Sequence, residues 1–467
     1  MKKLHALSIF GTSSDAGKST LAFALTYILH KRGIRVAPFK AQNVSNNAMI
    51  TDEDHGEIAI PQAFAAEAIG LPTHSDFNPV LLKSGSNATA HIIINGKSLK
   101  NESVWEYYRN IDKLKPVVRD AFRRLEERFE CIVAEGAGSP VELNLMEKDL
   151  ANIYVAKKFN TKIILVADIE RGGVFASIYG VKNLLPKKLR KNIIGVVINK
   201  FRGDMSLFDA GKAIIEERFK LPVLGVIPYR PFNLGFEDSA SLINYQQHKS
   251  NPCLQIAVIH LPYMANFTDF EPLIADPQIE LHFVRSALEA SHYDLVILPG
   301  SKRVFSDLAW LQDQGFFPLL KDQSQKIIGI CGGYEMLFET LYDPFGVESD
   351  TVQMQGIGRL KGSVTFAKEK ICNKGTYNLF GIIAKGYEIH YGTTKKKAKK
   401  AKNLHATFVH GLFESDALRY YFFHAINPAY SGYDFAAYKK NTIANYAKHI
   451  EDHLDCDTIL EALHAPQ

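Results

Sequence analysis

The sequence has few cysteines, and their arrangement excludes two common roles for this residue. Five occur in 467 residues, at Cys131, Cys253, Cys331, Cys372 and Cys456. Their number is odd and no two form a Cys-x-x-Cys pair, so neither a disulfide framework nor a zinc site is expected. This pattern favours a reducing, cytoplasmic setting.

Long apolar runs and a strong net charge are also missing. No stretch approaches the roughly 20 apolar residues that cross a bilayer, and the apolar run after Met1 is too short for a signal peptide. The formal net charge is only +5, without a basic stripe interleaved with aromatic residues. We therefore expect neither a membrane nor a nucleic acid as partner, whereas an anionic small molecule suits the mild positive bias.

What the sequence does contain is two series of short β-branched runs separated by helix-length segments. Strands that alternate with helices predict βαβ units, and so an α/β fold of two doubly wound domains with mostly parallel sheets. In the first series we expect strands at residues 7–10, 35–37, 131–134, 162–167, 193–198 and 223–227; in the second, at 254–258, 295–298 and 326–330. We expect a P-loop NTPase-like domain over 1–232, a linker over 233–252, and a flavodoxin-like domain over 253–467 with a helical C-terminal tail. The oligomeric state, a homo-oligomer included, is left open.

A phosphate-binding loop follows the first predicted strand. Residues 11–20 read Gly-Thr-Ser-Ser-Asp-Ala-Gly-Lys-Ser-Thr and lead into a predicted helix at 19–32. Glycines let backbone N–H groups approach phosphate oxygens, a lysine bridges the terminal phosphates, and a serine hydroxyl ligates Mg²⁺. The sequence therefore predicts a nucleotide site formed by Thr12, Asp15, Ala16, Gly17, Lys18, Ser19 and Thr20.

Magnesium requires further oxygen ligands, because this hard cation prefers carboxylates and hydroxyls. Glu135 follows a buried-looking strand and precedes two glycines, which is where open α/β sheets bind ligands. Glu57 is a second candidate, and Asp168 at the end of another strand is a third. We predict Ser19, Glu57 and Glu135 as the metal ligands.

A second chemical motif lies in the C-terminal half, where Gly-Ile-Cys-Gly-Gly-Tyr at 329–334 follows an apolar strand. A nucleophile on a sharp strand-to-helix turn needs small neighbours, and here they are glycines. We expect Cys331 to be the nucleophile and His410 its general base. Gly332 and Gly300 would supply oxyanion-hole N–H groups, and a helix is expected at 335–341.

Taken together, these motifs resemble the cobyric acid synthase family, in which a dethiobiotin-synthetase-like P-loop domain precedes a class I glutamine amidotransferase-like domain. The resemblance also includes segments 37–43, 78–83, 135–140, 166–176, 199–204, 298–302, 386–390 and 409–413, and it covers nearly the whole chain. The glycine spacing of the loop is one residue longer than the usual P-loop and is similar to dethiobiotin synthetase. Partition and septum-site ATPases carry an additional early lysine, where this chain has Ser13 and Ser14.

The resemblance implies a glutamine- and ATP-dependent amide synthase of cobalamin biosynthesis. Glutamine would be hydrolysed at Cys331, and the ammonia would pass internally to the first domain. There, with Mg²⁺, ATP would activate the b, d, e and g carboxylates of a corrinoid, adenosylcobyrinic acid a,c-diamide, to give adenosylcobyric acid. Similarity to the family also assigns Lys40, Asn43 and Lys83 to substrate or phosphate, and Asn199 to the adenine.

The sequence departs from the family pattern at several places. Ala-Ile-Pro at 59–61 replaces the usual Gly-Arg-Ala after the presumed metal acid, and Ser84 replaces a proline. The stretch between His390 and His410 is short and contains a lysine run that suggests a solvated loop. Leu412 stands where many class I glutaminases have a glutamate that orients the histidine, so Glu414 is the nearest substitute.

Two alternatives of different classes remain at this stage. One is a related enzyme, a cobyrinic acid a,c-diamide synthase or an amidotransferase for another polycarboxylate. The other is a non-catalytic, nucleotide-dependent regulatory P-loop protein. The presence of Lys18, Glu135, Cys331 and His410 favours an enzyme, because a binding module does not require both a phosphate lysine and a thiol elbow.

Overall fold

The computed structural model describes residues 4–84, 89–235, 249–395 and 398–465. The chain forms two compact units. The first contains Met1–Ser45, Thr51–Phe232 and Lys440–Gln467; the second contains Asn46–Ile50 and Asn233–Lys439. Most of the expected linker, residues 236–248, lies outside the described residues.

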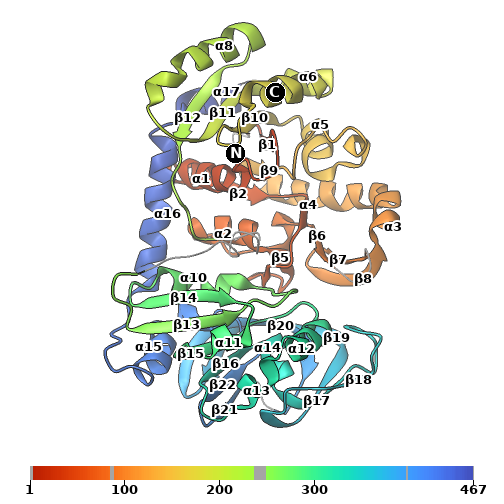
Figure 1. Cartoon of the computed structure of the whole chain (residues 1–467). Coiled ribbons are helices and arrows are strands. Elements are labelled where there is room, and N and C mark those ends of the chain that lie inside the picture. The colour runs from red at the N-terminus through yellow and green to blue at the C-terminus, as the bar shows by residue number, and fades with distance from the viewer. Residues whose placement is uncertain (1–3, 85–88, 236–248, 396–397, 466–467) are drawn as a thin grey trace. The chain divides into compact units, whose positions relative to one another are not determined.

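The first unit is built on a six-stranded parallel sheet in the order β12-β11-β10-β1-β9-β2 (Figure 1). The central strands β1, β9 and β10 carry almost no exposed side chains, as expected for a sheet covered on both faces. The strands are β1 (Leu7–Gly11), β2 (Val36–Phe39), β9 (Cys131–Glu135), β10 (Lys162–Asp168), β11 (Ile193–Phe201) and β12 (Val223–Pro228).

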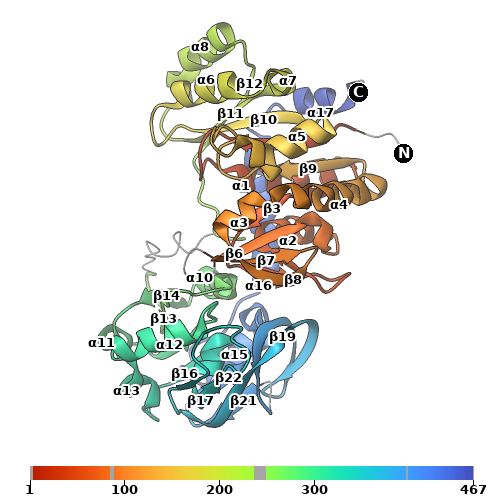
Figure 2. The same ribbon diagram turned by 90° about the vertical axis from the view of Figure 1, so that its right-hand side faces the viewer.

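Helices cover this sheet, and a smaller sheet extends the unit. The helices are α1 (Lys18–Lys31), α2 (Ile60–Ala68), α3 (Val104–Arg109), α4 (Lys115–Arg128), α5 (Val155–Phe159), α6 (Val174–Leu184), α7 (Lys187–Arg190), α8 (Asp209–Phe219) and α17 (Cys456–His464). The smaller sheet has the order β3-β6-β7-β8, with β3 (Gln42–Val44), β6 (Val80–Ser84), β7 (Thr89–Ile94) and β8 (Lys97–Ser103). Figures 1 and 2 show β6, β7 and β8 side by side. The short strand β5 (Glu57–Ala59) precedes α2.

The second unit contains a second mostly parallel sheet, in the order β14-β13-β15-β16-β22-β21. Its strands are β13 (Leu254–Ile259), β14 (Ile279–Val284), β15 (Leu295–Leu298), β16 (Ile327–Ile330), β22 (Leu404–Thr407) and the antiparallel edge strand β21 (Ala398–Ala401). The helices are α10 (Glu271–Ala275), α11 (Ala287–Ala290), α12 (Val304–Asp313), α13 (Phe316–Lys321), α14 (Gly332–Met336) and α15 (Asp416–His424); α16 (Phe435–Glu451) begins in this unit. A four-stranded sheet, β18-β17-β19-β20, completes it, with β17 (Phe338–Tyr342), β18 (Gln353–Gln355), β19 (Leu360–Leu379) and β20 (Ile382–Thr393). The predicted α/β class with mostly parallel sheets is confirmed.

The C-terminal tail is helical, as expected, but its end belongs to the first unit rather than to the second. Leu454 forms an isolated antiparallel bridge with Gly225 of β12, and His5 donates its N–H to the carbonyl of Leu463. Arg32 also forms ion pairs with Glu451 and Asp457, both at 2.9 Å. Ile459 and Leu463 are buried. This burial holds the end of the tail in the first unit, although the tail follows the second unit in sequence.

Two local predictions in the second half were wrong. The helix after the cysteine ends at Met336, and residues expected to continue it form β17 instead. In that strand Phe338 and Leu341 are buried, and β17 pairs with both β18 and β19. Residues 398–401 of the lysine run form the edge strand β21 instead of a loop, and lysines at a sheet edge discourage further strand pairing.

Candidate active sites

The phosphate loop connects β1 to α1, as the sequence predicts. Gly17 caps α1 with a positive φ of 96°. A Cβ at this position would lie 2.0 Å from Nδ2 of Asn199, so only glycine fits. The amide of Asn199 donates to the carbonyl of Ala16 at 2.9 Å, and therefore braces the loop; its contact with adenine stays a prediction.

Lys18 and Asp15 show how the loop is held. Lys18 is 7% exposed and donates through Nζ to the carbonyl of Ser13 at 3.0 Å, which keeps its charge inside the loop. Asp15 is exposed and pairs with Arg171 at 3.0 Å. The N–H of Thr12 donates to Val166 at 2.9 Å, and the hydroxyl of Thr20 donates to Gly17 at 3.0 Å. The loop is therefore tied to β10 as well as to its own helix.

Glu135 is the centre of a buried polar group beside the loop. Its Oε1 accepts from Ser19 Oγ at 2.6 Å and from Lys40 Nζ at 2.8 Å, and its Oε2 accepts from Gln62 Nε2 at 3.0 Å. Glu135 and Lys40 are 3% and 4% exposed. The structure thus brings together Ser19 and Glu135, two predicted metal ligands, with the predicted substrate residue Lys40.

Other predicted residues of the first unit lie in different contacts. Glu57 forms a buried ion pair with Lys83. Asp168, the third metal candidate, pairs with Lys200 at 3.0 Å. Asn43 is buried, and its side chain accepts from the N–H of Val44 at 2.8 Å. Within the described ranges, no three His, Cys, Asp or Glu side chains gather as a metal-binding group.

The departure at residues 59–61 leaves the Glu135 group intact. Pro61 stands in the first turn of α2, a position that proline tolerates because helix N–H groups there have no intrahelical acceptor. Gln62, the next residue, makes the contact to Glu135 described above. The substitution therefore changes the helix start without removing the amide that holds the carboxylate.

The cysteine elbow in the second unit has the expected geometry. Cys331 follows β16 and precedes α14, with φ 50° and ψ −111°, a backbone conformation that is strained for a non-glycine residue. A Cβ on Gly333 would lie 2.1 Å from the carbonyl oxygen of Leu298, so the turn requires glycine there. Cys331 is buried, and its N–H donates to Thr407 at 2.8 Å.

The two predicted oxyanion residues lie around this turn. A Cβ on Gly332 would lie 2.8 Å from the N–H nitrogen of Ser301, and a Cβ on Gly300 would lie 3.1 Å from Cε1 of His410. The turn after β15 therefore packs against both the elbow and the histidine. The use of the Gly332 and Gly300 N–H groups as oxyanion donors stays a prediction.

His410 is held by a carboxylate that the sequence motifs did not reveal. Its Nδ1 lies 2.7 Å from Oδ2 of Asp269, and Oδ1 of Asp269 accepts from the N–H of Gly411 at 2.7 Å. His410 is 1% exposed, and the ring of Tyr387 stacks on it. Glu414, the nearest candidate by sequence, is exposed. Asp269 therefore takes the orienting role for which the sequence suggested Glu414.

The charges around His410 favour its protonated form. Burial alone lowers the pKa of an imidazole, but the charges of Asp269 and Cys331 outweigh it and raise the pKa of His410 to about 10. A histidine beside a cysteine and oriented by an acid is the arrangement that activates a thiol nucleophile.

Comparison with known proteins assigns a family to each half of the chain. Residues 7–233 match the CobQ/CobB/MinD/ParA nucleotide binding domain. Residues 255–418 match the CobB/CobQ-like glutamine amidotransferase domain. The phosphate loop falls in the first match, and Cys331, His410 and Asp269 fall in the second.

Whole-chain relatives extend the comparison. The chain is 53% identical to a cobyric acid synthase of Acinetobacter baylyi over 98% of this chain and 99% of the relative. It is 37% identical to that of Chlorobium chlorochromatii, over 99% and 97%. With that of Limosilactobacillus reuteri the identity is 42%, over 84% and 79%.

The fold and the two sites thus define a glutamine amidotransferase joined to a P-loop nucleotide-binding domain, an amide synthase that hydrolyses glutamine. The chain belongs to the cobyric acid synthase family, whose enzymes act in cobalamin biosynthesis. None of the helices in the described parts of the chain combines the length and apolar character that a membrane crossing requires.

Proposed function

We propose that this enzyme uses ATP and glutamine to amidate the b, d, e and g carboxylates of adenosylcobyrinic acid a,c-diamide, giving adenosylcobyric acid. The observation that carries the proposal is the pair of sites on one chain. The cysteine elbow suits ammonia release, and the phosphate loop with the Ser19–Glu135–Lys40 group suits carboxylate activation. A regulatory P-loop protein does not need both sites.

Ammonia release begins at Cys331. Its thiolate attacks the side-chain amide carbon of glutamine, and the developing oxyanion is stabilised by N–H groups at the elbow, for which Gly332 and Gly300 are our candidates. His410, held by Asp269, gives a proton to the departing nitrogen, and ammonia leaves as the thioester forms. Water activated by His410 then hydrolyses the thioester to glutamate and restores the thiol.

Carboxylate activation uses the phosphate loop. A carboxylate is a poor acyl donor, so its oxygen first attacks the γ-phosphorus of ATP, and ADP leaves. Lys18 stabilises the charge on the transferred phosphoryl group. Ammonia then attacks the acyl phosphate, the C–O bond to phosphate breaks, and the amide forms with release of phosphate.

The residues beside the loop fit a magnesium ion. Mg²⁺ prefers oxygen donors and keeps several waters, so a hydroxyl and one carboxylate together with substrate phosphates suffice. Ser19 Oγ and Glu135 would hold it, and it supplies charge neutralisation at the transferred phosphoryl group. Lys40 already shares Oε1 of Glu135, and we assign it to positioning the phosphate or the substrate carboxylate.

The test is product analysis by mass spectrometry. Incubation with adenosylcobyrinic acid a,c-diamide, ATP, Mg²⁺ and glutamine should give a stepwise series in which each OH is replaced by NH₂, with one ADP formed per step. Glutamine hydrolysis without a change in the corrinoid would refute the substrate assignment. Conversion of cobyrinic acid to its a,c-diamide instead would identify the related synthase.

A further inference from the structure

A five-residue segment of the N-terminal half contacts the glutaminase site. Asn46–Ile50, which we call the strap, belongs to the second unit, whereas the residues before and after it in sequence belong to the first. It contains β4 (Ala48–Ile50). Asn47 and Ala48 are fully buried. The Oδ1 of Asn47 accepts from the N–H of Phe267 at 3.3 Å, so the strap is packed into the second unit rather than lying on its surface.

The strap determines the orientation of one side-chain amide, that of Asn266. The N–H of Ala48 donates to Oδ1 of Asn266 at 3.2 Å. Because a backbone N–H can only donate, the atom that faces it must be the amide oxygen. The amide nitrogen is thereby directed to the opposite side, where Nδ2 lies 3.2 Å from Nε2 of His410. Asn266 is 3% exposed, so water does not compete for these contacts.

This amide opposes the catalytic state of His410. An Asn N–H can interact favourably with Nε2 only when that nitrogen is unprotonated and offers its lone pair. The same lone pair must receive the proton of Cys331 when the thiolate forms. Asp269 and Cys331 favour the imidazolium, as described above, whereas the N–H of Asn266 favours the neutral ring.

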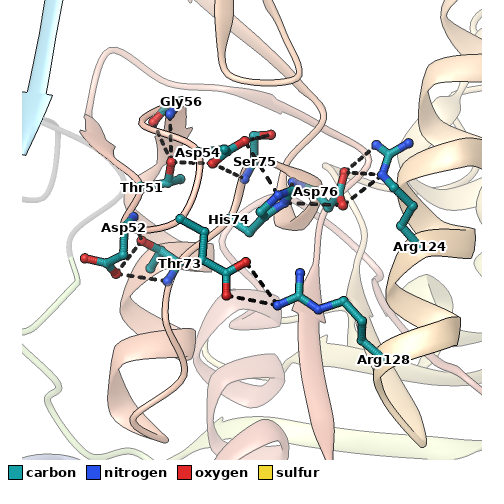
Figure 3. Close-up of polar contacts among 11 residues, drawn as sticks. Thr51, Asp52, Asp54, Gly56, Thr73, His74, Ser75, Asp76, Arg124 and Arg128 are labelled. Atoms are coloured by element: carbon teal, nitrogen blue, oxygen red, sulfur yellow. Dashed lines mark hydrogen bonds and ion pairs between the residues drawn. The ribbon is translucent and has the colours of Figure 1, made fainter.

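Both ends of the strap are fixed in the first unit. Before it, the N–H of Ser45 donates to Leu82 at 3.0 Å. After it, residues 51–56 form a polar network (Figure 3). Thr51 bonds to Asp54 at 2.6 Å and accepts from the N–H of Gly56 at 2.7 Å.

The network also connects residues 51–56 to the rest of the first unit. Asp54 accepts from Ser75 at 2.5 Å, and Asp52 exchanges hydrogen bonds with Thr73. Glu53 pairs with Arg128 of α4 at 3.0 Å. Figure 3 shows Arg124 and Arg128 extending from the same helix toward this network, with Arg124 directed at Asp76. The residues that flank the strap are therefore held by hydrogen bonds and ion pairs, so a displacement of these residues also displaces the strap.

The flanks of the strap are also the segments to which we assign ligands. Lys40 and Asn43 precede it and Glu57 follows it, and all three are buried. Under the proposed function these residues meet nucleotide, metal or corrinoid. A ligand that shifts these residues also moves the strap. The glutaminase site responds only if the protonation equilibrium of His410 differs between the two positions of the strap.

We propose that Asn266 is a positioning residue that restrains His410 while the synthetase site is empty, and that the strap Asn46–Ile50 withdraws this restraint when nucleotide and corrinoid bind. The coupling rests on the proposed function. The restraint itself concerns only the second unit. Glutamine hydrolysis is thereby kept low until an acceptor carboxylate is ready.

The test removes the restraint from each side of the Ala48–Asn266 hydrogen bond. Asn266→Gly deletes the amide and suits the left-handed backbone there, φ 55°, which alanine would strain. Ala48→Pro removes the strap's N–H while Asn266 keeps its amide. Asn378→Ala, which alters an exposed asparagine in the same unit, is the matched control.

Two measurements on the full-length enzyme report the restraint, with glutamine as the only substrate. Basal glutamine hydrolysis should rise about five- to tenfold in both variants, the effect of losing one hydrogen bond, and remain unchanged in Asn378→Ala. Iodoacetamide should alkylate Cys331 faster at neutral pH, with the half-maximal rate shifted to lower pH. Damage to the fold would expose the buried Cys331 and speed its alkylation, but it would lower hydrolysis. Only a rise in both rates therefore supports the restraint, and a decrease or no change in hydrolysis in both variants overturns it.

A third measurement reports the coupling. In the wild type, ATP with adenosylcobyrinic acid a,c-diamide should stimulate glutamine hydrolysis, and in both variants this stimulation should largely disappear because the basal rate is already high. Retained stimulation would overturn the role of the strap. A wild type that shows the restraint but makes no amidated corrinoid would refute the proposed substrate and leave the restraint standing.

Discussion

Asp269 and His410 lie 141 residues apart in sequence and 2.7 Å apart in the structure. The carboxylate meets the imidazole at Nδ1 and leaves Nε2 on the side of Cys331 and Asn266. A histidine held in this tautomer accepts a proton at Nε2 and returns it to the leaving group. This contact completes the glutaminase site.

Asp269→Asn should lower glutamine hydrolysis by about a hundredfold or more, because an amide can present its N–H to Nδ1 and fix the wrong tautomer. Steady-state kinetics with glutamine alone measure the effect, which should fall on kcat. The matched control is Glu414→Gln, at an exposed residue, for which we expect wild-type rates. A large loss in the control with none in Asp269→Asn would reverse the assignment.

Cys331→Ala should abolish glutamine-dependent amidation and leave ammonia-dependent amidation intact. The thiol is needed only to release ammonia, whereas the phosphate loop is in the other unit. ADP formation and corrinoid mass should be followed with ammonium chloride in place of glutamine. Failure of ammonia to support any product would argue against an independent synthetase site.

Glu135→Gln should remove ATP-dependent amidation with either nitrogen source while leaving basal glutamine hydrolysis in place. The substitution keeps the shape of the side chain but removes the charge that meets Ser19 and Lys40 and would hold Mg²⁺. Glu142→Gln, at an exposed position of the same unit, serves as control. Full amidation by Glu135→Gln would place the metal elsewhere.

The pH dependence of stability should include a contribution from Asp307. Burial raises its pKa to about 7, although Ser301 Oγ and the N–H of Tyr263 bond to it. The folded state therefore binds this proton more tightly than the unfolded state, so the contribution of Asp307 to stability is fully present below about pH 4 and is lost as pH rises toward 7. Asp307→Asn should weaken this dependence of the unfolding midpoint between pH 4 and 7. An equal slope in both proteins would contradict it.

The end of the C-terminal tail should stabilise the first unit. Leu463 is 1% exposed, and truncation of a buried leucine costs about 2–5 kcal/mol. Leu463→Ala should therefore lower the unfolding temperature of the synthetase half, whereas Glu461→Ala on the exposed face should not. Thermal unfolding followed by the loss of nucleotide binding measures this. Selective loss of glutaminase activity would instead assign the tail to the second unit.

The sequence predicts those features whose structure is determined by residues close together in the chain. The phosphate loop and the cysteine elbow are short turns in which glycines, a strand and a helix follow one another, so their geometry is encoded within a few residues. The position of Glu135 followed from the same logic, because a carboxylate at the end of a buried strand points to the ligand edge of the sheet.

The features that the sequence could not predict depend on contacts between segments that are distant in the chain. Asp269 lies in a Phe-Thr-Asp-Phe stretch that has no recognisable motif, and its role appears only when His410 is placed beside it. The assignment of Asn46–Ile50 to the second unit and of Lys440–Gln467 to the first likewise has no local signal. β17 was mistaken for helix because tertiary strand pairing overrode the expected continuation of the elbow helix.

The central claim is that one chain releases ammonia from glutamine at Cys331 and uses it to amidate a corrinoid at the phosphate loop. The most direct measurement supplies glutamine labelled with ¹⁵N in the amide, ATP, Mg²⁺ and adenosylcobyrinic acid a,c-diamide, and follows the corrinoid by mass spectrometry. We predict that the wild type adds ¹⁵N at each amidated carboxylate and that Cys331→Ala adds none. Label-free product, or an unchanged corrinoid while glutamine and ATP are consumed, would contradict the account.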